Sequence, residues 1–332
     1  MNSSISNSKK IPKAFLAAFL LFLVTVIAGV FYLIKTDTLP APIFTGRVSM
    51  DEKIRFLRMH YPINADVVTI GSSSALNNIS SQVFFDDPAV GKRYLNFSSW
   101  GLTMESTLRH WKIFDQIHDS KILIIGISFF DFNKSDDDPI NGTDIRRYIQ
   151  GRPTLLYYLK YHASGFSRRI WSTAKRRRTN DFLGSLKYDE GGGVLLDVPE
   201  ENVRKHYWQD ELTETRFQPG SYEALDQLLA DLREKGKIGV IVQSPVKGSS
   251  SVKEKRFFFL KHHWDKVDAI AKKHGMYFYN MYNIFESDDQ LFPDDMHVNH
   301  EGANMFTLQL FQRMKEDKIF QRVNMLAQKR GF

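Results

Sequence analysis

The pattern of apolar and polar positions predicts a folded region built from alternating strands and helices. From about residue 60, short apolar runs alternate with longer amphipathic stretches, a pattern typical of a parallel α/β sheet. The short runs predict strands near 66–71, 94–97, 121–127, 238–242 and 277–281. Helical spacing of apolar residues predicts helices near 103–118, 221–235 and 257–275, and a last one around 303–314. The sequence therefore predicts a three-layer α/β/α sandwich with a five-stranded parallel sheet.

One long stretch does not follow this pattern. From about residue 133 to residue 220 the chain is polar, rich in glycine and aromatic residues, and contains Gly191-Gly-Gly193. We interpret it as an insertion between the third and fourth strands of a single domain over 61–332. A chain of 332 residues would also accommodate two domains, at about 150 residues per domain.

An apolar run near the N-terminus is predicted to cross a membrane. The run from Ala14 to Ile34 is 21 residues long and contains no charged residue. A helix of that length covers about 30 Å, the thickness of the hydrocarbon core of a bilayer. Lysines within 9–13 precede the run, and such positive flanks stay in the cytoplasm. We therefore expect a cytoplasmic tail over 1–13, a transmembrane anchor over 14–34, and a C-terminal domain outside the cytoplasm, in the periplasm or at the cell surface.

A cleaved signal peptide is the alternative interpretation of this run. The apolar region of a signal peptide is about 7–15 residues long and is followed by small residues. This run is longer and ends in Val-Phe-Tyr-Leu-Ile, which favours a retained anchor. Pro40 and Pro42 then predict a stalk over 35–60, before the folded domain.

Composition excludes several classes of protein. The chain is 42% hydrophobic and 13% aromatic, which is too apolar for an intrinsically disordered protein. It contains no cysteine, which excludes a disulfide scaffold, a cysteine nucleophile and a lipid-modified cysteine. The absence of cysteine also suits an oxidising compartment. We expect no cofactor.

The net charge of +7 is concentrated in one basic cluster inside the insertion. Arg168 and Arg169 are followed by Lys175-Arg-Arg-Arg178, with Ile170 and Trp171 between them. We do not expect a nucleic-acid partner, because the domain is predicted to lie outside the cytoplasm. The cluster could contact anionic lipid headgroups, hold an anionic cell-envelope polymer, or form a solvated surface.

Polar residues follow the predicted strands, at the edge where open parallel sheets bind their ligands. Gly71-Ser-Ser-Ser74 follows the first strand, Ser98-Ser-Trp-Gly101 the second, and Ser128-Phe-Phe-Asp131 the third. A loop after the last strand carries Asp294-Asp-Met-His297. A serine, a glycine N–H and an Asp-x-x-His pair are therefore expected to converge, and these are the parts of a serine hydrolase site.

Each of these groups has a task in acyl transfer. A serine hydroxyl becomes a nucleophile when a base, such as an imidazole within about 3 Å, removes its proton. A carboxylate orients the imidazole and stabilises its positive form. Preorganised N–H donors stabilise the oxyanion, and loss of one donor costs about 3–4 kcal/mol. A glycine can present its N–H without a side chain in the way.

The order of these motifs resembles the SGNH (GDSL-type) hydrolase superfamily over residues 66–316, apart from the long insertion. The resemblance implies a flavodoxin-like fold in which Ser73 is the nucleophile. His297 would be the general base and Asp294 the carboxylate that orients it. Gly302 stands in the usual place after the histidine. We expect no metal at this site.

The same resemblance implies an oxyanion hole. Its donors would be Ser73 and Gly101, and Asn96, five residues before Gly101, would support them. The family's third block carries an asparagine donor, but here that block is Gly126-Ile-Ser128-Phe. Ser128 would replace the asparagine through its hydroxyl, or the hole would have two donors.

A second departure indicates a branch of the family. Ser72 stands where many members have aspartate. Gly-Ser-Ser variants resemble the branch that includes membrane-anchored proteins of teichoic-acid D-alanylation and polysaccharide O-acetylation. Proteins of this branch work beside a membrane-bound O-acyltransferase, which the resemblance suggests as a partner.

Other interpretations of these residues remain open. Asp294, Asp295, His297 and His300 could together bind a metal, although the sequence offers no further ligand cluster. His300 could be a rival base, but a surface position is favoured. Trp100 either forms a wall of the pocket or packs against the domain.

Two functions of different classes follow. The first is a membrane-anchored, extracytoplasmic serine esterase or O-acyltransferase that acts on acyl esters, expected to be acetyl esters, of a cell-envelope polysaccharide. The second is a catalytically inactive domain of the same fold that binds a glycan or organises an envelope synthesis complex. His262 and His263, on a predicted amphipathic helix, are interpreted as solvated and outside either site.

Overall fold

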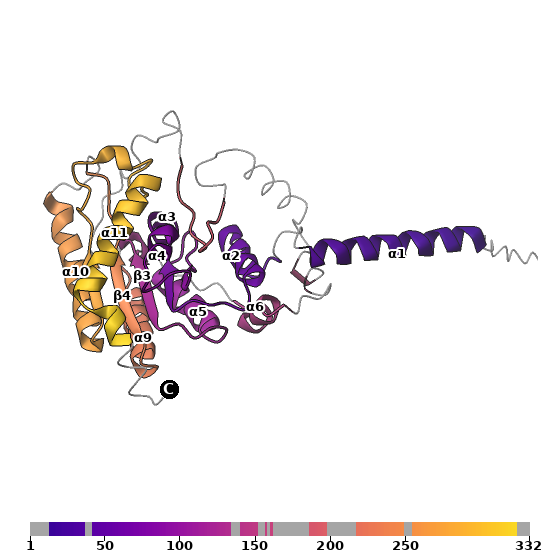
Figure 1. Cartoon of the computed structure of the whole chain (residues 1–332), viewed down its shortest axis with the longest axis horizontal. Helices are drawn as coiled ribbons and strands as arrows, with labels where there is room; N and C mark the ends of the chain where they lie inside the picture. Colours follow the sequence, from indigo (N-terminus) through magenta and orange to yellow (C-terminus); the bar gives the residue numbers. More distant parts are fainter. Residues whose placement is uncertain are drawn as a thin grey trace, which may run out of the picture.

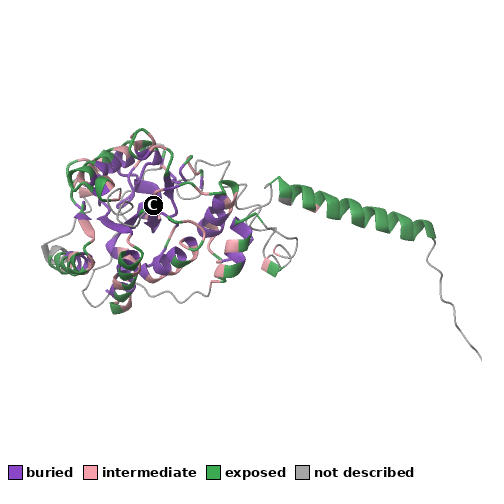
Figure 2. Ribbon diagram, turned by 60° about the horizontal axis from the view of Figure 1, so that its bottom comes forward, coloured by how far each residue is buried: buried purple, intermediate pink, exposed green. Residues whose placement is uncertain are grey.

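The structure is a computed structural model that describes residues 13–36, 42–133, 140–151, 157, 160–161, 186–197, 217–248 and 254–323, with the backbone alone at 34 and 254–257. Helix α1 (Lys13–Lys35) projects from the rest of the molecule and is exposed along nearly its whole length (Figure 1; Figure 2). Its portion Lys13–Leu33 is long and apolar enough to cross a membrane. The predicted basic cluster at 168–178 lies outside the described residues.

All five predicted strands are present and form one parallel sheet. They are β1 (Val67–Gly71), β2 (Tyr94–Asn96), β3 (Ile122–Ile127), β4 (Ile238–Gln243) and β5 (Tyr277–Asn280). Their order across the sheet is β2-β1-β3-β4-β5, and every neighbouring pair is parallel. The predicted five-stranded parallel sheet is therefore confirmed.

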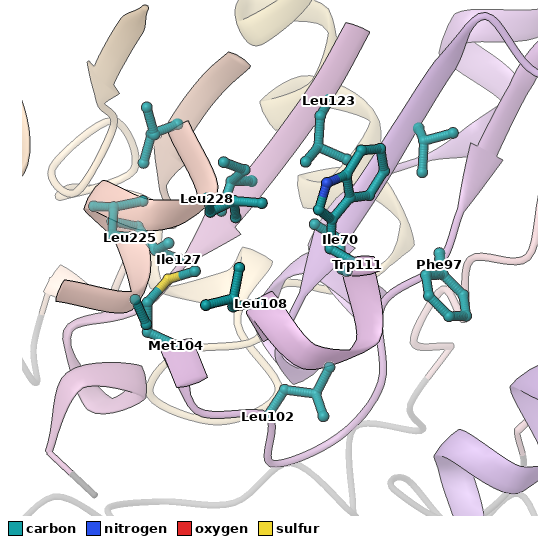
Figure 3. Close-up of a cluster of buried hydrophobic side chains, with 14 of the residues drawn as sticks. Ile70, Phe97, Leu102, Met104, Leu108, Trp111, Leu123, Ile127, Leu225 and Leu228 are labelled. Atoms are coloured by element: carbon teal, nitrogen blue, oxygen red, sulfur yellow. The ribbon is translucent and has the colours of Figure 1, made fainter. Parts of the chain in front are cut away.

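Helices cover both faces of the sheet, because alternate strand residues feed two separate apolar cores. One core joins Ile70, Leu123 and Ile127 to helices α5 (Met104–Phe114) and α9 (Pro219–Glu234) (Figure 3). Helix α10 (Glu254–His274) contributes to the same core. The other joins Ile122 and Ile124 to α4 (Ser81–Phe85) and α11 (His300–Glu316). The predicted three-layer sandwich is therefore confirmed.

The predicted stalk over 35–60 is too long, because its second half belongs to the folded domain. Phe44 is buried in the first core, and helix α2 (Val48–Met59) follows it. Ile54 and Leu57 of this helix are at most 1% exposed. The apolar face of α2 is therefore covered by the domain, and the helix lies on the side of the molecule nearest α1 (Figure 1).

Two described parts of the predicted insertion pack back onto the domain. Helix α6 (Gly142–Ile149) lies beside α2, and Arg58 of α2 stacks on Tyr148. The segment 186–197 runs past β2, where the Asn96 N–H donates to the Gly191 carbonyl at 2.7 Å. This segment therefore reaches the carboxyl end of β2.

His263 is buried, which corrects the interpretation of this residue as solvated. It shares the core-facing side of α10 with Trp264. Its Nδ1 forms a 2.8 Å hydrogen bond with the Tyr222 hydroxyl, and Phe217 stacks on its ring. Burial lowers the pKa of His263 to about 3, so the ring is neutral at physiological pH.

Candidate active site

Ser73 lies at the turn between β1 and the short helix α3 (Ser73–Asn78). The helix packs closely on the strand ends because two glycines leave room for it. A Cβ on Gly126 would lie 2.5 Å from the Cβ of Ala75, and a Cβ on Gly71 would lie 2.0 Å from the Gly126 carbonyl oxygen. Within 71–80, Ser73 is the one residue that is not buried, and it lies just past the carboxyl end of β1.

The structure brings Ser73, His297 and Asp294 together. Ser73 Oγ lies 2.9 Å from His297 Nε2, although the two residues are 224 positions apart. On the other side of the ring, Nδ1 lies 2.7 Å from Asp294 Oδ2. Asp294 Oδ1 accepts from the backbone N–H groups of Met296 and His297, at 2.9 and 2.7 Å. The three-residue gap thus closes into one turn that holds the carboxylate against the ring.

Electrostatics keep Asp294 ionised in this buried position. Burial opposes its ionisation, but the nearby His297 and the hydrogen bonds from the His297 side chain and two backbone N–H groups outweigh burial and lower the pKa of Asp294 below its usual value. An ionised carboxylate accepts from Nδ1–H, which leaves Nε2 as the basic nitrogen facing the serine. This arrangement can withdraw the serine proton and stabilise the resulting imidazolium.

Gly101 lies in the loop after β2 and has a φ of +63°, a left-handed conformation that glycine adopts without strain. Its N–H has no hydrogen-bond partner within the part of the chain that the structure describes. Ser99 in the same loop donates its N–H to the Gly71 carbonyl at 3.1 Å, so this loop adjoins the serine turn. The Ser73 N–H is in the first turn of α3, where no intrahelical acceptor exists. Both predicted backbone donors are therefore available at one edge of the sheet.

Asn96 holds this edge together through its side chain. It is fully buried at the end of β2. Its Nδ2 donates to the Ala75 carbonyl at 2.9 Å, and its Oδ1 accepts from the Ser98 N–H at 2.9 Å. The side chain thus links the helix that begins at Ser73 to the loop that carries Gly101.

Ser128 has a different set of contacts from those of an oxyanion donor. Its Oγ accepts from the Phe130 N–H at 3.1 Å and caps the 3-10 helix η1 (Phe129–Phe132). Its own N–H donates to Asp131 Oδ2 at 2.8 Å. The third strand end is connected to the serine turn by Asp131, whose Oδ2 also accepts from Ser72 Oγ at 3.0 Å.

Asp131 follows the third strand in the run Ser128-Phe-Phe-Asp131, but the sequence predicted no role for it. Burial raises its pKa to about 7, although the hydrogen bonds from the Ser128 N–H and Ser72 favour the ionised form. Ser72 Oγ lies 3.1 Å from Ser74 Oγ, so hydrogen bonds connect Asp131 to both residues that flank the nucleophile in the chain. The spacing Ser128-x-x-Asp131 is that of the local capping contact, but no spacing indicates the contact with Ser72, which is 59 positions away.

Two of the residues considered as metal ligands, Asp294 and His300, are poorly placed to bind an ion. Both carboxylate oxygens of Asp294 accept hydrogen bonds from residues 296 and 297. His300 is exposed at the start of α11. Among the described residues, no group of three or more His, Asp or Glu side chains is placed to bind a metal.

Trp100 packs beside a small cluster of Leu76, Leu186 and Val194.

A cavity of about 450 Å³ lies at the opposite edge of the sheet. Its lining includes Asp66, Val67 and Ile122, which stand at the amino ends of β1 and β3. Because Ser73 follows the carboxyl end of β1, this cavity is separate from the candidate active site.

Comparisons with known proteins give likenesses to solved structures alone, because no family model matches the chain and no curated protein matches it significantly. A candidate acylhydrolase from Bacteroides fragilis is 9% identical with a TM-score of 0.42, covering 79% of this chain and 95% of that one. The lipase/acylhydrolase from Enterococcus faecalis is 10% identical with a TM-score of 0.40, covering 76% and 96%. An acetylxylan esterase from Geobacillus stearothermophilus is 12% identical with a TM-score of 0.39, covering 75% and 94%. At such identities and TM-scores the activity of this chain has to be argued from the geometry around Ser73.

Proposed function

We propose that this chain is a serine esterase or O-acyltransferase that works through an acyl-Ser73 intermediate. The observation that carries the proposal is the 2.9 Å contact between Ser73 Oγ and His297 Nε2, with Asp294 Oδ2 2.7 Å from the other ring nitrogen. Ser73 is partly exposed while its neighbours within 71–80 are buried, and a nucleophile needs such exposure to meet its substrate.

The reaction follows from the positions of these groups. His297 Nε2 takes the proton of Ser73 Oγ as that oxygen attacks the ester carbonyl, and Asp294 stabilises the imidazolium. The N–H groups of Ser73 and Gly101 stabilise the oxyanion of the tetrahedral intermediate. Collapse of the intermediate breaks the bond to the leaving alcohol, which takes the proton from His297. A water or a sugar hydroxyl then attacks the acyl-serine by the reverse sequence and regenerates Ser73.

The proposed substrate is an acyl ester of a cell-envelope polysaccharide, met outside the cytoplasm by an enzyme that α1 anchors to the membrane. Support for the anchor comes from the apolar 21-residue portion Lys13–Leu33 and the lysines that precede it. Support for the polysaccharide, and for a membrane-bound O-acyltransferase as partner, comes from the Gly71-Ser-Ser motif and its resemblance to O-acetylation proteins.

The test is hydrolysis of p-nitrophenyl acetate by the full chain in detergent. We expect Ser73→Ala to abolish hydrolysis and His297→Ala to come close to doing so, both with unchanged thermal unfolding midpoints. His300→Ala is the matched control and is expected to retain activity, because His300 is exposed. Full activity of Ser73→Ala would contradict the assignment of the nucleophile.

The inactive glycan-binding or scaffold domain is the second candidate, and the contacts of Ser128 favour it. The Ser128 hydroxyl caps η1, so the third block supplies no evident replacement for the family's asparagine donor. If the folded wild-type chain neither hydrolyses acetyl esters nor reacts with a serine-directed probe, this second function is favoured.

A further inference from the structure

The start of helix α2, which the sequence pattern assigns to a stalk, contacts the loop that carries Gly101. Arg47, at the N-cap of α2, donates from Nη1 to the Gly101 carbonyl oxygen at 2.6 Å. Ser49 Oγ accepts from the Trp100 N–H at 3.1 Å and lies 2.7 Å from Ser99 Oγ. Two side chains of one short segment thus bind three consecutive residues of the loop.

These contacts bind two peptide groups of the loop, and a third peptide group, which they do not bind, lies between them. Ser49 binds the N–H of the peptide group that joins residues 99 and 100, whereas Arg47 binds the carbonyl of the group that joins 101 and 102. The group between them carries the Gly101 N–H, which has no partner among the residues that the structure describes. Fixing both flanking peptide groups fixes the direction of this N–H, and an oxyanion donor is effective only when it is oriented before the reaction.

The segment is itself firmly placed. Ser49 is 2% exposed. Asp51 Oδ1 accepts from the N–H and the hydroxyl of Thr45, at 2.8 and 2.9 Å, which fixes the chain just before α2. One turn further along, Lys53 Nζ donates to the Asn96 carbonyl at 2.8 Å and also to the Gly192 carbonyl. The support for the loop is thus anchored on both sides.

We propose that Arg47 and Ser49 are positioning residues that orient the Gly101 N–H for oxyanion stabilisation. This inference rests on the proposed acyl-transfer function. Because neither side chain need touch the substrate, loss of either should affect the charged transition state more than the binding of the neutral ester.

The experiment compares Arg47→Ala, Arg47→Lys and Ser49→Ala with the wild-type full chain in detergent. With p-nitrophenyl acetate, we expect Arg47→Ala and Ser49→Ala to lower kcat by about 10- to 100-fold while KM changes less than about threefold. Arg47→Lys keeps a donor and should recover part of the rate. Binding of phenylboronic acid, which forms a tetrahedral adduct with the serine, should weaken in parallel with kcat.

The matched control is Arg58→Ala, which removes the same side chain from the other end of α2, where it stacks on Tyr148. Its kcat and boronate affinity should stay within about twofold of the wild type. The inference is overturned if Arg47→Ala and Ser49→Ala, folded by their thermal midpoints, keep the wild-type kcat, or if Arg58→Ala loses as much. Failure of the wild-type chain to hydrolyse the ester would instead overturn the proposed function, and this inference with it.

Discussion

His297 is placed between two groups that make opposite demands on its ring. Nδ1 lies 2.7 Å from Asp294 Oδ2, and Nε2 lies 2.9 Å from Ser73 Oγ. The ionised carboxylate can only accept a hydrogen bond, so it selects the tautomer whose Nε2 is basic.

This selection predicts the effect of Asp294→Asn. The amide can donate to Nδ1 and favour the tautomer that cannot take the serine proton. We expect kcat for acetyl ester hydrolysis to fall by about 10⁴, as the same change does in a serine protease, while KM changes little. The kinetics of purified variants check this, with Asp289→Asn on the short helix η5 (Asp289–Leu291) as the control. A loss of less than tenfold would show that the carboxylate does not set the tautomer.

The raised pKa of Asp131 leads us to expect that stability falls as the pH rises. Its pKa is about 7 in the folded chain and near 3.8 when unfolded, so between these values the folded state binds more protons than the unfolded state. The free energy of unfolding should therefore decrease from about pH 4 to pH 7, by a few kcal/mol at most. Asp131→Asn, which resembles the protonated acid, should remove this decrease. Thermal midpoints at pH 4, 5, 6 and 7 test it, and parallel curves for the two proteins would contradict it.

Helix α2 is held in place by the buried amine of Lys53, for which we expect the opposite pH dependence of stability. Lys53 Nζ donates to the Asn96 carbonyl at 2.8 Å and lies 4.4 Å from the centre of the Tyr188 ring. Burial lowers its pKa to about 7, opposed by the charge of Asp189.

The folded chain therefore binds fewer protons than the unfolded chain between about pH 7 and pH 10.5. Stability should rise over this range, and Lys53→Met should flatten the rise. Thermal midpoints from pH 7 to pH 10 check this, with Lys112→Met as the exposed control on α5. The idea fails if the control flattens the rise equally.

The same helix shows why part of the fold was hidden in the sequence. All five strands were located from the pattern of short apolar runs, and four of them, β1 to β4, are buried along their whole length, as the runs indicate. The run at β5 was also found, although this strand is only partly buried. In α2, however, the charged residues Asp51, Glu52 and Lys53 are buried beside Ile54. They interrupt the apolar stripe by which a core helix is recognised in a sequence. His263 was misplaced for the same reason, because a polar residue stands on the core-facing side of α10.

Over the whole molecule, the sequence predicted those residues of the candidate site that follow a strand in the chain. Ser73, Gly101 and His297 each follow a strand, and parallel strands present their carboxyl ends at one edge. Arg47 and Ser49 contact residues more than 50 positions away, as Asp131 does through Ser72, and no local spacing indicates these contacts.

The proposed topology can be tested directly because the chain contains no cysteine. A single cysteine at Leu308, which is 57% exposed on α11, should react with a membrane-impermeant maleimide in intact spheroplasts. A single cysteine at Ser4, in the predicted cytoplasmic tail, should react only after lysis. Reaction of both positions only after lysis would contradict an extracytoplasmic domain.

The central claim is that Ser73 is a nucleophile activated by His297, and active-site labelling measures this without knowledge of the natural acceptor. The purified full chain is incubated with a fluorophosphonate, and the modified residue is identified by mass spectrometry. We predict one adduct, on Ser73, that is absent from Ser73→Ala and forms at least about 100-fold more slowly in His297→Ala. A folded wild-type chain that takes up no label, or a Ser73→Ala variant that is labelled as fast as the wild type, would contradict the account.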